Sequence, residues 1–159
     1  MSVLVVLGSK TDIEVAGKAC DMLEEFGVPY ELRVCSAHRT PRALIKLIDE
    51  STADVFIAVA GMAAALPGVI AAHTTKPVIG LPVGGKVPFD SLLSTVQMPP
   101  GIPVASVGVD RGENAGLLAV EILAVRDPAL REKLEAHRRK LEKTTQDGDR
   151  EVTRKGPKN

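Results

Sequence analysis

Residues able to bind a phosphate and to move a proton follow one another in the segment SAHRTP at 36–41. Ser36 supplies a hydroxyl, and the Arg39 guanidinium can hold a phosphate through two parallel hydrogen bonds. The His38 imidazole beside it can act as both general acid and general base. A surface histidine next to an arginine that pairs with a nearby acid is the alternative explanation for this segment.

The segment GSKTD at 8–12 is a second candidate for binding an anion. Gly8 lets the backbone approach a ligand, Ser9 and Thr11 carry hydroxyls, and the free amides of a following helix N-terminus favour negative charge. Asp12 can hold sugar hydroxyls beside such an anion, or it can simply complement the helix dipole. Helix capping without any ligand explains GSKTD equally well.

The segment GMAAALPG at 61–68 carries no ionisable side chain. Its backbone amides and carbonyls, including those of Gly61 and Ala63, can close against a planar heterocycle because the turn is built from small residues. The sequence shows no carboxylate pair, His/Cys cluster or Walker-type lysine loop, so it indicates neither a metal nor a nucleoside triphosphate. His73 and His137 lie outside these segments, and we expect both to be structural or exposed.

The elements that must position these segments alternate between strands and helices. Apolar runs and apolar alternation predict strands at 3–7, 30–34, 55–60, 78–81 and 104–107, separated by helices. Thr11 and Glu14 have capping-box spacing, Thr40 is the expected N-cap before a proline, and a short helix is expected after Pro67. This alternation predicts a three-layer α/β sandwich, flavodoxin-like or Rossmann-like, with a central parallel sheet. Ligands bind beyond the carboxyl ends of such strands, where these three segments and a fourth, LPVGG at 81–85, lie.

Two further helices follow the last predicted strand. Residues 113–124 are apolar on nearly all sides, and the charged helix after Pro128 carries a narrow stripe of Leu130, Leu134, His137 and Leu141. This spare apolar surface predicts packing against another subunit, with a thick core as the alternative. We therefore expect one domain over 1–143 with C-terminal oligomerisation helices, and a polar, frayed tail over 144–159.

The length of 159 residues suits one domain, and 20 basic against 20 acidic residues give a net charge of zero. This balance and an aromatic content of only 3% argue against a nucleic-acid partner. No apolar run is long enough to span a membrane, and the first residues do not have the pattern of a signal peptide. We expect a cytoplasmic protein in which Cys20 and Cys35 are buried free thiols.

Taken together, the motifs resemble those of the carboxyaminoimidazole ribonucleotide mutase family of purine biosynthesis. The resemblance runs from about residue 3 to residue 124 and is carried by GSKTD, SAHRTP, AGMAAALPG at 60–68, PVIGLPV at 77–83 and DSLLSTVQMPPGIPVASVGV at 90–109. It implies a flavodoxin-like homo-octamer that needs no metal or organic cofactor. It also implies that the carboxylate of 5-(carboxyamino)imidazole ribonucleotide moves from the exocyclic nitrogen to carbon 4 of the ring.

The same resemblance implies roles for individual residues. His38 matches the catalytic histidine of the family, while the substrate-binding positions fall on Ser9, Asp12 and Arg39, with Ser36 and Thr11 nearby. Ser9, Thr11 and Arg39 would hold the 5′-phosphate, and Asp12 the ribose hydroxyls. In the implied mechanism, CO2 lost from the nitrogen stays in an apolar pocket and adds to carbon 4, while His38 donates the first proton and accepts the last. The Ala-rich wall at 61–66 would keep water away from the CO2.

The sequence also departs from the family pattern. The mutases usually read GGAAHLPG in the third segment, so Met62 here replaces a glycine and Ala65 a histidine, and the loop over 83–90 is shorter. A sister class that carboxylates aminoimidazole ribonucleotide directly tends to read SAHKT, so Arg39 favours the mutase. That direct carboxylase stays an alternative. So do a carboxylase acting on a pyridinium mononucleotide and a non-catalytic module that binds a sugar phosphate or flavin mononucleotide.

Overall fold

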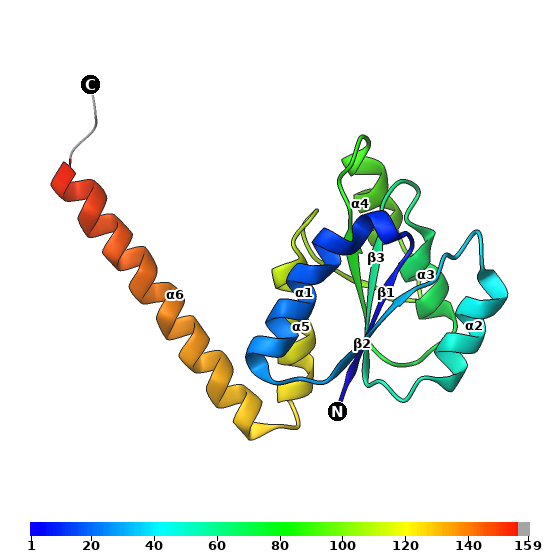
Figure 1. Cartoon of the computed structure of the whole chain (residues 1–159), viewed down its shortest axis with the longest axis horizontal. Helices are drawn as coiled ribbons and strands as arrows, with labels where there is room; N and C mark the ends of the chain where they lie inside the picture. Colours follow the sequence, from blue (N-terminus) through cyan, green and yellow to red (C-terminus); the bar gives the residue numbers. More distant parts are fainter. Residues whose placement is uncertain (156–159) are drawn as a thin grey trace.

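The chain forms one parallel sheet flanked by helices, seen in a computed structural model that describes residues 1–155 (Figure 1). The strands are β1 (Val3–Leu7), β2 (Tyr30–Val34), β3 (Val55–Ala60), β4 (Val78–Pro82) and β5 (Ala105–Ser106). The helices are the short 3-10 turn η1 (Lys10–Asp12), then α1 (Ile13–Phe26), α2 (Pro41–Glu50), α3 (Ala65–Ala72), α4 (Pro88–Val96), α5 (Gly112–Ala124) and α6 (Pro128–Lys155). The strand order β2-β1-β3-β4-β5 is that of the flavodoxin-like fold. The predicted three-layer α/β sandwich is confirmed.

Both faces of the sheet are covered by apolar side chains. On β1, Val5 and Leu7 pack in the core shared with α1 and α5, whereas Leu4 and Val6 pack in the core shared with α2 and α3. Successive side chains of a strand point to opposite faces, so one strand serves both cores. Burial on both faces explains why β1, β3 and β4 are continuous apolar runs in the sequence.

Some element boundaries differ from those predicted. α3 begins at Ala65 rather than after Pro67. Amides in the first turn of a helix have no carbonyl partner within the helix, so a proline there costs no hydrogen bond. β5 is shorter than predicted, because only Ala105 and Ser106 pair with β4. The capping box of Thr11 and Glu14 is wrong: η1 precedes α1, and Ser9 Oγ accepts the Thr11 amide at 3.4 Å.

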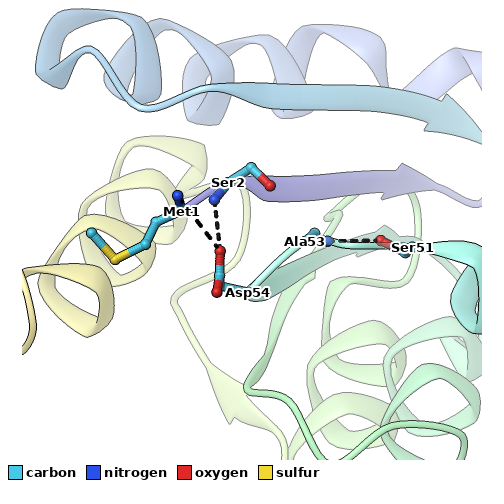
Figure 2. A network of polar contacts seen from close by, with 5 residues as sticks. All are labelled: Met1, Ser2, Ser51, Ala53 and Asp54. Carbon is cyan, nitrogen blue, oxygen red and sulfur yellow. Dashed lines mark hydrogen bonds and ion pairs between the residues drawn. The ribbon is translucent and has the colours of Figure 1, made fainter.

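Polar contacts tie together the edge at which β1 and β3 begin (Figure 2). The Asp54 carboxylate accepts the Ser2 amide at 2.8 Å and lies 4.0 Å from the amino group of Met1. The Asp54 amide in turn donates to the Ser2 carbonyl at 2.9 Å. Close by, Ser51 Oγ accepts the Ala53 amide at 3.2 Å. These contacts hold the starts of two neighbouring strands, so their carboxyl ends lie level at the other edge.

α5 packs closely against α1 through glycines. A Cβ on Gly112 would collide with the Val15 carbonyl oxygen, and one on Gly116 would lie 2.7 Å from the Ala19 carbonyl oxygen. α5 is apolar nearly all round, yet Leu117 and Leu118 on it are only partly buried. Apolar surface on α5 is therefore left partly open to solvent in the single chain.

α6 is a long helix that leaves the body of the domain (Figure 1). Leu130 is buried against the α1/α5 core, whereas every described side chain from Arg138 onward is exposed. The frayed tail expected from residue 144 is wrong over 144–155, where the helix continues. Within this stretch the Thr144 and Thr145 hydroxyls donate to the carbonyls one turn earlier, at 2.9 Å and 3.1 Å, and Arg150 lies 3.4 Å from the Asp147 carboxylate. Residues 156–159 lie outside the described chain. None of the helices formed by residues 1–155 has the length and apolar content needed to span a bilayer.

Candidate active site

The carboxyl ends of β1, β2 and β3 surround a cavity of about 410 Å³. All the residues predicted to contact substrate or to catalyse the reaction line it: Ser9, Thr11, Asp12, Ser36, His38, Arg39, Gly61 and Ala63. The chain passes from β1 outward to β2 and then back to β3, so the cavity lies at the switch point of the sheet. The sheet thus brings three loops that are distant in sequence to one place.

A second and larger cavity, of about 920 Å³, lies at the opposite edge of the sheet. α2 and α3 end beside it, so the negative ends of their dipoles face it. Lys76 lines this cavity, but its Nζ already donates to the Ser51 carbonyl at 3.2 Å. An anionic ligand is therefore better matched by the first cavity, where helices begin.

The loop after β1 places two hydroxyls beside a buried carboxylate. The Thr11 hydroxyl lies 2.9 Å from Ser9 Oγ and 3.1 Å from Asp12 Oδ1, so it can donate to either. Asp12 is 9% exposed, and this burial raises the pKa of its carboxyl. The hydrogen bonds from Thr11 and the Ser9 backbone, and the positive charge of Arg39, partly offset the rise in pKa.

Arg39 links the loop after β2 to the end of β1. Its Nη2 donates to the Gly8 carbonyl at 2.7 Å, and its Nε donates to Ser36 Oγ at 3.3 Å. Ser36 Oγ also accepts the Arg39 amide at 3.2 Å. Within residues 1–155 no hydrogen bond uses Nη1 of Arg39, which leaves that nitrogen available to a phosphate.

His38 lies next to Arg39 at the cavity and is exposed. Its imidazole makes no hydrogen bond to any residue of the described chain. Both ring nitrogens can therefore meet a ligand, and nothing in residues 1–155 fixes which of them carries the proton. A histidine in this state can give or take a proton at a bound substrate.

The third wall of the cavity is apolar and comes from the loop after β3. Ala64 and Leu66 are buried, whereas Met62 is 68% exposed at the cavity. Met62 and Ala64 have positive φ angles of 54° and 29°, a conformation that side-chain-bearing residues rarely adopt. The turn that this conformation creates brings the Ala64 amide to 3.0 Å from the Gly61 carbonyl. No ionisable group lies on this wall.

Three helix N-termini meet at the same edge of the sheet. α1, α2 and α3 all begin there, and the residue before each helix makes no side-chain hydrogen bond to it. The first amides of a helix have no intrahelical partner and carry the positive end of the dipole. For α1 these are the amides of η1, because η1 runs into α1 and the Ile13 amide already donates to the Lys10 carbonyl. This edge of the sheet therefore favours a negatively charged ligand.

The family model described as AIR carboxylase matches residues 2–144. The chain belongs to the AIR carboxylase family. It is 54% identical over 151 residues to the N5-carboxyaminoimidazole ribonucleotide mutase of Methanocaldococcus jannaschii, covering 94% of this chain and 96% of the relative. The corresponding Bacillus subtilis mutase is 48% identical over 147 residues, covering 88% and 91%. A crystal structure of Treponema denticola PurE matches with a TM-score of 0.82 and 26% identity, covering 96% of both chains.

In this member of the AIR carboxylase family, the sequence interpretation missed the contacts of one residue beside the site. Thr40 was expected to cap α2, but its side chain makes no hydrogen bond to that helix. Its hydroxyl instead accepts the Ser36 amide at 2.9 Å. Thr40 belongs to the SAHRTP segment, so the sequence did place it beside the candidate residues. A threonine directly before a proline is also typical of a helix N-cap, and that pattern led to the capping prediction.

Proposed function

We propose that this chain catalyses the N5-carboxyaminoimidazole ribonucleotide mutase reaction, moving a carboxylate from the exocyclic nitrogen to carbon 4 of the imidazole ring. The observation that carries the proposal is the placement of His38 beside Arg39, facing a wall without ionisable groups, in one cavity. The curated names of the relatives in Methanocaldococcus jannaschii and Bacillus subtilis support the same activity.

The phosphate and the ribose would be held by different side chains. Arg39 offers Nη1 to the 5′-phosphate, and the Ser9 and Thr11 hydroxyls lie on the same side of the cavity. A charge-assisted hydrogen bond of this type is shorter and stronger than a neutral one. Asp12 would accept hydrogen bonds from the ribose hydroxyls, a role that suits a buried carboxylate better than contact with a phosphate. Backbone groups of Gly61 and Ala63 would face the imidazole ring.

The proposed chemistry needs one proton donor that becomes an acceptor. Breaking the bond from nitrogen to the carboxylate releases CO2, and the electron pair left on nitrogen takes a proton from His38. Carbon 4 then attacks the CO2, and neutral His38 removes the proton that carbon 4 carried. His38 donates one proton and later accepts one, so the reaction neither takes up nor releases a proton overall.

The apolar wall would keep the released CO2 in place. Ala63, Ala64 and Leu66 offer no hydrogen-bonding side chain to water or bicarbonate. Holding the CO2 against carbon 4 makes the second step effectively intramolecular, which is where most of the rate gain would arise. Exclusion of water also prevents loss of the CO2 to hydration.

A pair of substrate assays tests this proposal against the direct carboxylase. Purified protein is given 5-(carboxyamino)imidazole ribonucleotide without bicarbonate, and in parallel aminoimidazole ribonucleotide with bicarbonate. Turnover of the first substrate alone is the expected result. Turnover of the second alone would identify a direct carboxylase, and turnover of neither would favour a binding module.

We further propose that the protein is a cytoplasmic homo-octamer with a small-molecule substrate. The part of α6 beyond the core and the partly open apolar surface of α5 support assembly, because both offer surface to a neighbouring copy. A phosphorylated ribonucleotide does not cross bilayers unaided, which supports a cytoplasmic location. Light scattering tests the assembly, and a particle with the mass of one chain would refute it.

A further inference from the structure

We propose that Thr40 is a positioning residue that holds the catalytic loop, residues 36–39, in its working shape. The proposal rests on the proposed function, because it concerns how His38 and Arg39 are placed for that reaction. Thr40 itself does not line the cavity, whereas all four residues of the loop do. Apart from an effect on the folded fraction, we therefore expect any effect of Thr40 on turnover to pass through those residues.

The Thr40 hydroxyl satisfies both backbone groups of Ser36. Oγ1 accepts the Ser36 amide at 2.9 Å and lies 3.2 Å from the Ser36 carbonyl oxygen, to which it can donate. The Thr40 amide also donates to that carbonyl at 3.0 Å. One side chain thus joins the first residue of the loop to the residue that follows its last one.

This use of the hydroxyl replaces the usual role of a threonine before a helix. At an N-cap, the threonine oxygen ordinarily accepts an amide from the first helical turn. Thr40 makes no such bond to α2, although it directly precedes Pro41 at the first helical position. Its hydroxyl bonds the loop instead of the helix that it precedes.

Ser36 in turn connects Thr40 to Arg39, the residue predicted to bind the phosphate. Ser36 Oγ accepts both the amide and the Nε of Arg39, at 3.2 Å and 3.3 Å. Arg39 then reaches the Gly8 carbonyl at 2.7 Å. His38 has no hydrogen bond of its own within residues 1–155, so the closed loop fixes the backbone from which its imidazole extends.

The Thr40 hydroxyl also contacts a residue next to the sheet. Its Oγ1 lies 3.4 Å from Sγ of Cys35, which is 7% exposed. The Cys35 amide donates to the Leu7 carbonyl at 2.9 Å, extending the pairing of β1 with β2. The loop is thus held against backbone that belongs to the paired strands, as a preorganised site requires.

The test compares Thr40→Val, which keeps the branched shape and removes the hydroxyl, with Thr40→Ser, which keeps the hydroxyl. We expect Thr40→Val to lower kcat at least tenfold and to raise KM for the carboxyamino substrate several-fold, since both His38 and Arg39 lose their placement. Thr40→Ser is expected to restore both constants to within threefold. Thr74→Val is the matched control, because Thr74 Oγ1 accepts the Lys76 amide in a loop at the opposite edge; its constants should stay within twofold of wild type.

Two results would overturn the proposal: unchanged kcat and KM in Thr40→Val, or a lower kcat that only follows the folded fraction while KM stays constant. If Thr40→Val does not fold, Thr40→Ala replaces it with the same expectations. Hydrogen exchange of a peptide covering 35–40 gives a measurement that does not need the reaction. Faster exchange at this loop in Thr40→Val is expected even if the wild type proves inactive on the ribonucleotide. That inactivity would refute the proposed function alone, whereas unchanged exchange would refute the role of Thr40.

Discussion

Replacement of His38 by asparagine separates catalysis from folding and binding. Asparagine keeps a hydrogen-bonding side chain of similar reach but cannot exchange a proton near neutral pH. If His38 is the acid and base of both steps, His38→Asn loses the proton transfer at nitrogen and the one at carbon 4 together. The phosphate and ribose contacts, which belong to other residues, stay in place.

The expected magnitudes follow from the environment of His38. Its side chain is exposed and makes no hydrogen bond within the described residues, so its loss should change the free energy of unfolding by less than about 0.5 kcal/mol. A positioned general acid or base contributes roughly 10²- to 10⁴-fold in rate. At about 1.36 kcal/mol for each factor of ten, the barrier should rise by about 3–5 kcal/mol. The expected rise in the activation barrier is therefore several times larger than the expected change in the free energy of unfolding.

His73→Asn is the matched control for this substitution. His73 is also exposed, but it follows α3 at the opposite edge of the sheet and lines the second cavity. Turnover of 5-(carboxyamino)imidazole ribonucleotide should fall only in His38→Asn, while calorimetry finds the affinity for the product ribonucleotide within a few-fold in all three proteins. A His38→Asn protein that retains more than a tenth of wild-type kcat would refute the single-histidine mechanism. Loss of ribonucleotide binding in that variant would show instead that His38 holds the substrate.

Four further predictions concern binding, packing, pH and assembly. Arg39→Ala should raise KM tenfold or more with a smaller effect on kcat, measured by steady-state kinetics, because it removes the one cation lining the cavity. Gly112→Ala should lower the free energy of unfolding by about 1–3 kcal/mol, measured by denaturant titration. Gly17→Ala in α1 should instead raise it by about 0.5–1 kcal/mol, because a Cβ at Gly17 meets open space. Burial raises the pKa of Asp12 in the folded state, so its ionisation destabilises the fold once the pH exceeds the pKa of the unfolded chain. Asp12→Asn should therefore be more stable than wild type at pH 7, measured by denaturant titration. An equally large gain at pH 3.5 would contradict this. Truncation after residue 137 should leave a folded domain of lower oligomeric mass, measured by light scattering.

The sequence was sufficient to predict the architecture and the location of the cavity. The apolar run 3–7 ends at Gly8 and the alternating strand 30–34 ends before Ser36, so the end of each apolar pattern identified a strand end. Parallel pairing then brings those ends together, whatever the exact helix boundaries. The candidate residues were predictable because ligand sites in this architecture lie at one known edge.

Hydrogen-bond competition was not predictable in the same way. Thr40 has the local signature of a helix cap, but the Ser36 backbone competes for the same hydroxyl, and only the folded loop decides between them. The positive φ of Met62 likewise has no signal in a side chain that usually avoids it. The length of α6 was underestimated because a charged sequence is compatible with both a helix and a frayed tail.

A chain with no net charge can still bind an anion because its positive potential is concentrated at one edge. The cavity lining includes one permanent cation, Arg39, and one carboxylate, Asp12, so its charged side chains cancel in number. The starts of α1, α2 and α3 lie at the same edge, and their helix dipoles add positive potential that does not titrate. A phosphate is therefore expected at the free Nη1 of Arg39 rather than at Asp12, because burial raises the pKa of the Asp12 carboxyl and so disfavours negative charge there. The part of the substrate that meets this carboxylate must therefore donate hydrogen bonds and carry no negative charge, as ribose hydroxyls do.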